Sequence, residues 1–171
     1  GKVMITGEGG MIVTNNEQLF IDARAYHDHG HEYSKTIGRG LEAALLAGFN
    51  YRMTELQGAI GIVQLSKLPM ILECKRKNKS KLLSKIKDIP FEFREITDHG
   101  ELGDAVVFYC DSKEQSAKFV ALMREEGLGT KNLPDAIKWH FAKYWDHMLA
   151  DVGRWKKSAD ILERAIALPI N

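Results

Sequence analysis

The chain has 171 residues, enough to bury a substantial core as one large or two small domains, and its 24 lysines and arginines nearly balance its 23 aspartates and glutamates. The net charge of +1 excludes the broad positive field typical of proteins that bind nucleic acid or an anionic membrane surface. With 44% hydrophobic and 27% charged residues the composition is that of an ordinary globular protein, and no apolar run approaches the roughly 20 residues that span a bilayer.

The first ten residues place one amine before a glycine-rich turn. Lys2 is followed by Gly7, Gly9 and Gly10, and glycine lets the backbone take positive φ or pass close to a bound group. A lysine amine becomes nucleophilic once its pKa is lowered, so the pattern indicates a lysine beside a small-molecule or phosphate pocket. The alternative is a hairpin turn with a solvated lysine. The apolar residues 10–14 predict a short strand.

A helix and a long loop are expected next. Asn15 is predicted to cap the helix, with Gln18 three residues later in a capping-box arrangement, and Gly30 to end it as a C′ residue. Residues 27–40 are polar and show no period, which predicts a loop. A loop of that length is often functional.

Three histidines in this loop, His27, His29 and His31, stand at alternate positions. That spacing suits metal ligands only if the segment is extended, and no cysteine or further carboxylate cluster completes a site. We interpret them as solvated loop histidines and expect no bound metal. If the loop borders a pocket, one of them could contact substrate.

A second capping box, Thr54 with Gln57, predicts a helix that ends near Leu65, and Pro69 is predicted to begin another. The apolar side of this next helix carries Leu72, Leu82, Leu83 and Ile86. Its other side carries Lys75, Arg76, Lys77, Lys79, Lys81, Lys85 and Lys87. Because the overall charge is near zero, we interpret these basic residues as a solvated face rather than a nucleic-acid or membrane patch.

Beyond Pro90 the pattern predicts a compact α+β unit. Residues 91–96 and 105–110 are expected to be strands. Ser112 is predicted to cap a helix that Gly127 ends. The side chains expected to face the core from that helix are Ala117, Val120 and Met123.

The last third holds an aromatic segment and a helix. Residues 135–148 are dense in aromatics and histidines, and rings at helical spacing are typical of a core. Residues 154–165 read as an amphipathic helix, and Leu168 with Pro169 as the start of an exit segment.

The cysteines and the first residues bear on compartment. Cys74 and Cys110 lie far apart and form no metal-ligand spacing, which favours a reducing compartment. The first residues do not resemble a signal peptide. We therefore expect a cytoplasmic protein.

Two motifs in this order resemble a known family. Lys2 stands five residues before Gly7-Glu8-Gly9-Gly10, and a second motif follows, Gly48-Phe49-Asn50-Tyr51-Arg52-Met53-Thr54-Glu55-Leu56-Gln57. Both resemble the DegT/DnrJ/EryC1/StrS family of pyridoxal-phosphate-dependent sugar aminotransferases, and the looser similarity covers essentially the whole chain. Residues 28–40, 76–79 and 139–140 look most like enzymes of the 8-amino-3,8-dideoxy-octulosonate aminotransferase type, which aminate an octulosonate sugar acid.

The resemblance implies an α/β fold, the C-terminal portion of a fold-type-I, aspartate aminotransferase-like, pyridoxal-phosphate-dependent transferase. Residues 1–68 would be the end of the large cofactor-binding domain with its inter-subunit motif. Residues 69–171 would be a connecting helix and a small α+β domain, itself incomplete. Members of the family are more than twice this long, so we expect the isolated chain to be inactive.

The resemblance also implies roles for four residues. Lys2 would hold the pyridoxal phosphate covalently and carry the proton that moves during amino transfer. Asn50 would reach the cofactor phosphate of the neighbouring subunit in a homodimer with shared active sites. Arg52 would bind phosphate or a substrate carboxylate, the alternative being an interface salt bridge. His140 would contact the sugar, although Lys138 and Trp139 replace the Pro-Leu that precedes this histidine in the family.

The implied activity is transfer of an amino group, with glutamate as donor, to a keto sugar or keto sugar acid in cell-surface polysaccharide or amino-sugar biosynthesis. A sugar dehydratase of the same family is an alternative, but dehydratases carry histidine at the position of Lys2. A different fold-type-I transaminase is a further alternative. From another class, the chain could be a non-catalytic dimerisation or regulatory module.

Overall fold

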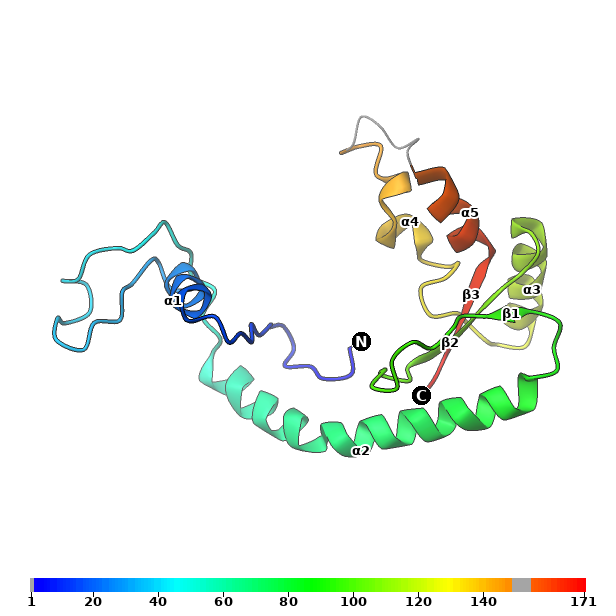
Figure 1. The fold of residues 1–171 in the computed structure, drawn as a ribbon, viewed down its shortest axis with the longest axis horizontal. Coiled ribbons are helices and arrows are strands. Elements are labelled where there is room, and N and C mark those ends of the chain that lie inside the picture. Colours follow the sequence, from blue (N-terminus) through cyan, green and yellow to red (C-terminus); the bar gives the residue numbers. More distant parts are fainter. Residues whose placement is uncertain (1, 149–154) are drawn as a thin grey trace. The chain divides into compact units, whose positions relative to one another are not determined.

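The computed structural model describes residues 2–148 and 155–171. The chain divides into two compact units, Gly1–Leu68 and Pro69–Asn171 (Figure 1). Among the helices so described, none is long and apolar enough to cross a membrane.

Helix α1 (Glu17–Tyr26) opens the first unit. Its cap is Asn16, whose side chain accepts a hydrogen bond of 2.9 Å from the Leu19 N–H, so the cap lies one residue after the expected Asn15. Gly30 adopts φ of 88° and its N–H bonds to the Ala25 carbonyl at 2.8 Å, closing the helix end a few residues beyond Tyr26.

The strand expected at residues 10–14 is wrong. This segment is irregular and largely exposed. A strand exists only through hydrogen bonds to a neighbour, and none of the residues described in the structure offers one to this segment.

Residues 27–40 are irregular as expected, the irregular segment continues to residue 50, and its two ends pair. Asp28 and Asn50 form an isolated antiparallel bridge, and the His29 N–H bonds to the Phe49 carbonyl at 2.9 Å. A β-carbon on Gly48 would lie 2.5 Å from the Gly30 nitrogen, so only glycine allows this close approach. The pairing places Asn50 next to Asp28.

Helix α2 (Glu55–Ile86) starts at the predicted capping box. The Thr54 N–H bonds to Gln57 Oε1 at 2.9 Å, and the Gln57 N–H to Thr54 Oγ1 at 3.3 Å. The break expected between Leu65 and Pro69 is wrong, because Pro69 lies inside one continuous helix. Leu65 is exposed, so water can donate to the carbonyl that proline leaves without its helical partner.

The second unit contains an antiparallel sheet of order β1-β2-β3 (Figure 1). Its strands are β1 (Glu92–Phe93), β2 (Ala105–Tyr109) and β3 (Ala165–Pro169). β2 pairs along its whole length with β3, from Ala105 opposite Pro169 to Tyr109 opposite Ala165. The sequence analysis did not predict β3, and it predicted a strand longer than β1. Both errors arise because pairing with a strand distant in sequence determines where these strands form.

Helix α3 (Lys113–Glu125) supplies the cover of the core. As predicted, Ser112 caps it and Gly127 follows its end with φ of 72°. Val120 and Met123 belong to the core cluster with Phe108, Cys110 and Ile166. The prediction that Ala117 faces inward is wrong, because the buried positions repeat at 116, 120 and 123, and Ser116 takes that place.

The basic face of α2 is only partly solvated. Lys79 is buried and its ammonium donates to Glu101 Oε1 at 2.5 Å, while Lys75 donates to the Ile170 carbonyl at 2.6 Å. Lys77, Lys81, Lys85 and Lys87 are exposed as expected. Burial of Lys79 is tolerated because its charge is paired.

The aromatic segment is folded into short turns. It forms α4 (Ile137–His140) and the 3-10 helix η1 (Ala142–Tyr144). Ile137 is buried, but Trp139 is 82% exposed, so the expectation of an aromatic core is wrong at that ring.

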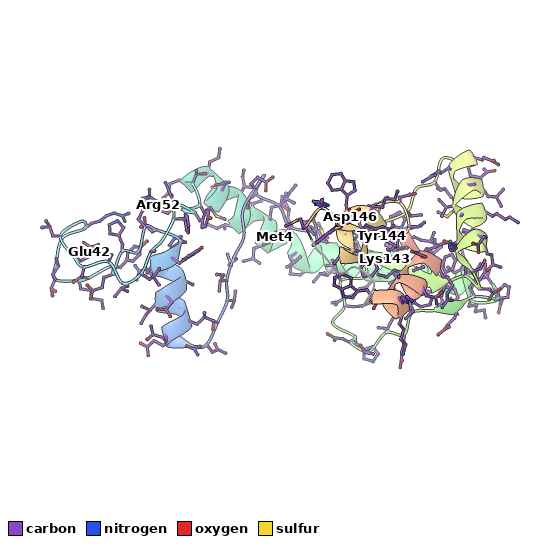
Figure 2. All side chains as sticks on the ribbon, turned by 90° about the horizontal axis from the view of Figure 1, so that it is seen from above. Met4, Glu42, Arg52, Lys143, Tyr144 and Asp146 are labelled. Carbon is purple, nitrogen blue, oxygen red and sulfur yellow. The ribbon has the colours of Figure 1, made fainter. Side chains whose placement is uncertain are left out.

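Helix α5 (Lys156–Arg164) follows, and the predicted start at residue 154 lies outside the described residues. Lys143 and Tyr144, labelled in Figure 2, both donate to Glu163 Oε1, at 2.5 and 2.7 Å. Burial and this bond to Glu163 raise the pKa of Tyr144 to about 12. The contact ties η1 to α5.

Candidate functional site

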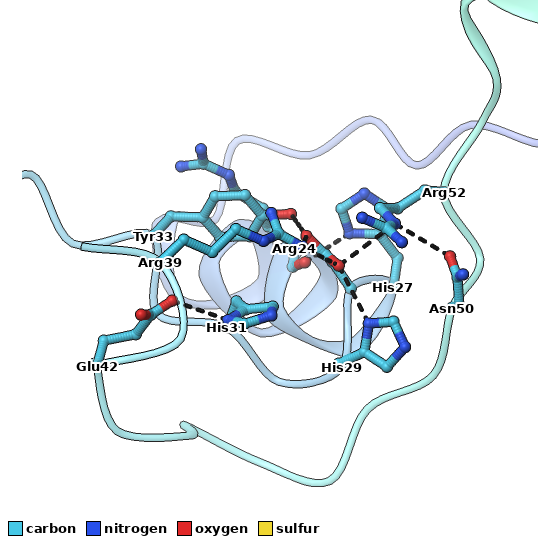
Figure 3. A network of polar contacts seen from close by, with 10 residues as sticks. Arg24, His27, His29, His31, Tyr33, Arg39, Glu42, Asn50 and Arg52 are labelled. Carbon is cyan, nitrogen blue, oxygen red and sulfur yellow. Dashed lines mark hydrogen bonds and ion pairs between the residues drawn. The ribbon is translucent and has the colours of Figure 1, made fainter. Parts of the chain in front are cut away.

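A buried carboxylate, Asp28, is the centre of a polar network in the first unit (Figure 3). The Tyr33 hydroxyl donates to Asp28 Oδ2 at 2.5 Å. One terminal nitrogen of Arg39 lies 2.7 Å from each carboxylate oxygen. Asp28 directly follows the end of α1, and its pairing with Asn50 holds it against the start of the second motif.

Arg52 and Asn50, both predicted site residues, contact each other, and Arg52 also contacts this carboxylate. Arg52 Nε donates to Asn50 Oδ1 at 3.0 Å and lies 3.4 Å from Asp28 Oδ1. The side chain of Arg52 is 46% exposed, and its two terminal nitrogens bond to no described residue. The bond through Oδ1 also leaves the Asn50 amide nitrogen as a donor. The pair therefore offers N–H donors that an anionic oxygen can use.

The aromatic ring of Tyr33 lies between two guanidinium groups. The Arg24 guanidinium carbon is 3.8 Å from the ring centroid and that of Arg39 is 6.0 Å away. Such cation–π contacts attract both charges to the ring. Tyr33 adopts φ of 58°, a conformation that a bulky residue takes only when its surroundings hold it.

The network is electrostatically biased towards an ionised aspartate. The hydrogen bond from Tyr33, with those from Arg39 and His29, holds the pKa of Asp28 far below its ordinary value despite burial. Burial and the same hydrogen bond to Asp28 raise the pKa of the Tyr33 phenol. Asp28 is therefore a permanent negative charge, and Tyr33 remains a donor, near neutral pH.

The loop histidines are more engaged than we expected. His29 Nδ1 lies 3.3 Å from Asp28 Oδ1, and His31 Nδ1 lies 2.8 Å from Glu42 Oε1. Asp28, His29 and His31 bring one possible ligand atom each within 4.8 Å of one another. Both Asp28 oxygens already accept from Arg39, whose positive charge would repel a metal ion, so we assign no metal to this group.

Lys2 is exposed, in the segment that leads to the glycine-rich turn. Gly7 and Gly9 adopt φ of 84° and 153° in that turn, as the glycines predicted. Gln57 Nε2 donates to the Glu8 carbonyl at 2.8 Å and so fastens the turn to the first turn of α2. The lysine-bearing segment and the Asn50–Arg52 motif thus both lead to the same helix end.

His140 lies elsewhere, in the second unit, where it is the exposed last residue of α4. Its assignment to a sugar pocket stays a prediction.

The sequence did not single out Asp28, Tyr33 or Arg39. The available signal was an aspartate near the end of a predicted helix, in a loop rich in arginine, histidine and tyrosine. Only the pairing of residue 28 with residue 50 shows that this carboxylate contacts the second motif.

The chain matches the family model of the "DegT/DnrJ/EryC1/StrS aminotransferase family" over residues 1–171. It is 36% identical over 98 residues to GDP-4-keto-6-deoxy-D-mannose 3-dehydratase of Escherichia coli O55:H7, covering 50% of this chain and 25% of the relative. It is 33% identical over 91 residues to UDP-4-amino-4,6-dideoxy-N-acetyl-beta-L-altrosamine transaminase of Helicobacter pylori, covering 53% of this chain and 23% of that relative.

The fold is similar to solved structures from two bacteria. The sugar aminotransferase CalS13 from Micromonospora echinospora superposes with a TM-score of 0.76 at 18% identity, covering 99% of this chain and 44% of that one. PseC from Helicobacter pylori, an aminotransferase involved in the biosynthesis of pseudoaminic acid, superposes with a TM-score of 0.68 at 19% identity, covering 92% of this chain and 42% of that one. The chain therefore spans less than half the length of these solved relatives.

Proposed function

Because the chain belongs to the DegT/DnrJ/EryC1/StrS aminotransferase family, we propose that the protein containing it transfers an amino group, with glutamate as donor, to a keto sugar or keto sugar acid. The family depends on pyridoxal phosphate and includes sugar aminotransferases, and the chain has a mixed α/β structure that forms part of a fold-type-I enzyme of this kind. Residues 1–68 are then the end of its large domain and residues 69–171 the connecting helix and part of its small domain.

The observation that carries the proposal is the convergence of two motifs on one helix end. Gln57, in the first turn of α2, donates to the Glu8 carbonyl in the turn after Lys2. Asn50 and Arg52 immediately precede the same helix, and each has donors left for an anion. A primary amine and oxyanion donors are the groups that pyridoxal phosphate requires of its protein, so the residues present fit this cofactor.

Lys2 is the proposed catalytic residue. Bound pyridoxal phosphate would supply an electron sink that makes the Cα proton of the amino donor acidic. The Lys2 Nζ atom would hold the cofactor covalently between turnovers. Once freed by the incoming amine, the same nitrogen would take the proton from Cα of the amino donor and deliver it to the C4′ carbon of the cofactor.

Asn50 and Arg52 are the proposed oxyanion contacts. In a homodimer with shared active sites, Asn50 would donate to the cofactor phosphate of the partner subunit. Arg52 would bind phosphate or a substrate carboxylate through the terminal nitrogens of its guanidinium. His140 would border the sugar. The setting we propose is amino-sugar or cell-surface polysaccharide biosynthesis in the cytoplasm.

The finer proposal is an octulosonate sugar acid as substrate. It rests on the resemblance of residues 28–40, 76–79 and 139–140 to enzymes of that type, and the carboxylate of such a sugar suits a guanidinium partner. The two relatives described above carry the names of nucleotide-linked sugars instead. A screen of keto sugars, with and without nucleotide, against the full-length protein loaded with the aminated cofactor decides between these classes.

Dehydration is the second candidate, because one relative with 36% identity is named a 3-dehydratase. The lysine at position 2 favours transamination, since dehydratases of the family have histidine there. A non-catalytic dimerisation module is the remaining alternative, and it would bind no cofactor covalently.

Borohydride reduction of the full-length protein with pyridoxal phosphate tests the proposal. We expect the cofactor to become fixed to the peptide that contains Lys2, as read by mass spectrometry, and glutamate to yield 2-oxoglutarate in a half-reaction. Lys2→Ala should abolish both, while Lys87→Ala, at an exposed lysine, should change neither. An unlabelled Lys2, or full activity of Lys2→Ala, would contradict it.

A further inference from the structure

We propose that Asp28 is a positioning residue, whose buried carboxylate holds Arg52, and with it Asn50, in the orientation that binds an oxyanion. The inference deepens the proposed function and rests on it. The oxyanion would be the cofactor phosphate or a substrate carboxylate, which share the same chemistry.

The first step of the argument is the orientation of the guanidinium. Arg52 Nε faces inward, at 3.0 Å from Asn50 Oδ1 and 3.4 Å from Asp28 Oδ1 (Figure 3). A guanidinium is planar and rigid, so fixing Nε on Asn50 and Asp28 also fixes the directions in which the two terminal nitrogens can donate. An unanchored arginine would lose side-chain entropy on binding, whereas this one has already lost it.

The second step is the strength of the anchor. Asp28 is 0% exposed and accepts from Tyr33 and from Arg39 at both oxygens, so its carboxylate cannot turn away. A carboxylate removed from water interacts with a neighbouring charge more strongly than an exposed one. Asp28 therefore holds a fixed position, and its contact with Arg52 Nε restricts the orientation of that guanidinium.

The third step is the local charge. Three guanidinium groups, those of Arg24, Arg39 and Arg52, contact the Asp28 carboxylate or the ring of Tyr33. Against the single charge of Asp28, and with neutral histidines, they leave an excess of two positive charges. An arriving oxyanion would offset this excess, which is the arrangement expected of a receptor rather than of a closed salt bridge.

Main-chain hydrogen bonds hold this loop together, so the role of the Asp28 carboxylate can be tested without disrupting the pairing. Asp28 pairs with Asn50 through main-chain atoms, and the Tyr51 N–H bonds to the His27 carbonyl at 2.8 Å. These bonds do not involve the Asp28 side chain, so Asp28→Asn should keep the loop paired while removing the charge.

The test measures the affinity of full-length cofactor-free protein for pyridoxamine 5′-phosphate, which binds through its phosphate without a covalent link to lysine. Asp28→Asn should weaken this affinity, or raise KM for the carboxylate-bearing substrate, by about tenfold, and kcat should change less. A weaker affinity for pyridoxamine 5′-phosphate would identify the oxyanion as the cofactor phosphate, and a raised KM would identify it as the substrate carboxylate. Arg52→Ala should change the same quantity as Asp28→Asn.

Glu42→Gln is the matched control. Glu42 is a second carboxylate in the same loop, with its side chain 2% exposed, but its partner is His31 rather than a guanidinium. We expect it to lower the melting temperature without changing the affinity. Equal losses of affinity in the two variants would mean that only the stability of the loop matters and would overturn the inference.

A double-mutant cycle decides whether Asp28 acts through Arg52. In the Arg52→Ala background, Asp28→Asn should change the affinity less than twofold, whereas additive effects would overturn the proposal. If Asp28→Asn does not fold, Tyr33→Phe, which removes one hydrogen bond to Asp28, replaces it in the cycle with about a threefold effect expected. Borohydride labelling of Lys2 is independent of these results, so failure of the cycle and failure of the proposed function are distinguishable.

Discussion

At the scale of single residues, the chain keeps one carboxylate ionised by surrounding it with donors. Asp28 accepts hydrogen bonds from Tyr33 and Arg39, and the cost of removing it from water is offset by these charge-assisted bonds. The buried thiol of Cys110 shows the opposite case, since burial and the nearby Asp111 charge raise its pKa although Arg164 opposes them.

The first prediction concerns acid stability. The pKa of Asp28 is lower in the folded state than the ordinary value of about 3.9 in the unfolded chain. The stability that it contributes is thus fully present above about pH 4 and is lost as the pH falls below that value. Urea denaturation between pH 7 and pH 3 should show a smaller loss of stability for Asp28→Asn than for the wild type.

Asp146→Asn serves as the control for this measurement, because Asp146 is an exposed aspartate (Figure 2). Its pH profile should follow that of the wild type. Parallel profiles for Asp28→Asn and the wild type would show that the Asp28 carboxylate carries no special share of the acid sensitivity.

The second prediction concerns the two thiols. Cys74 is exposed and Cys110 is buried in the core. The thiolate is the reactive form, so burial and the raised pKa both protect Cys110. Iodoacetamide labelling followed by peptide mass spectrometry should modify Cys74 in the native protein and Cys110 only after denaturation. Rapid native labelling of Cys110 would mean that the sheet and α3 do not pack as described.

At the scale of elements, local capping signals decide where helices begin. The Thr54–Gln57 box and the Ser112 cap both satisfy backbone donors that a helix leaves open at its first turn. Where the sequence was wrong, the deciding interaction came from a distant residue, as for β3, which exists because it pairs with β2.

The third prediction tests one of these caps. Ser112→Ala should lower the free energy of unfolding by about 1 kcal/mol, because the Gln115 N–H loses its acceptor at 3.1 Å. Ser84→Ala, at an exposed serine inside α2, should change it by less than about 0.5 kcal/mol. Urea denaturation followed by tryptophan fluorescence measures both. Equal changes in the free energy of unfolding for Ser112→Ala and Ser84→Ala would show that the Ser112 cap does not stabilise the fold.

At the scale of the whole molecule, the proposed function gives this chain only one part of a site. The proposed oxyanion donors Asn50 and Arg52 lie in the first unit with Lys2. The family resemblance assigns no residue of this chain as the carboxylate partner of the pyridine nitrogen. The chain spans less than half of its solved relatives. Two subunits would then share each pocket.

The fourth prediction follows from this division. The 171-residue chain alone should convert no glutamate to 2-oxoglutarate with pyridoxal phosphate and a keto sugar, whereas the full-length protein should do so. A coupled glutamate dehydrogenase assay measures the difference, and sedimentation of the full-length protein should give a dimer. Turnover by the isolated chain would contradict the shared-site proposal.

The sequence by itself determined what depends on neighbours along the chain. It determined the capping residues Ser112 and Thr54, the irregular loop of residues 27–40 and the order of the two motifs that indicate the family. The caps depend on hydrogen bonds between residues three or four positions apart, and the loop and the motifs are recognised from the order of the residues alone.

Only the tertiary structure decided which side chains meet across longer distances. It placed Asp28 beside Arg52, buried Lys79 against Glu101, and left Trp139 exposed. The physical reason is that burial and charge pairing depend on the partners that folding brings together, and periodicity within one segment carries no information about those partners.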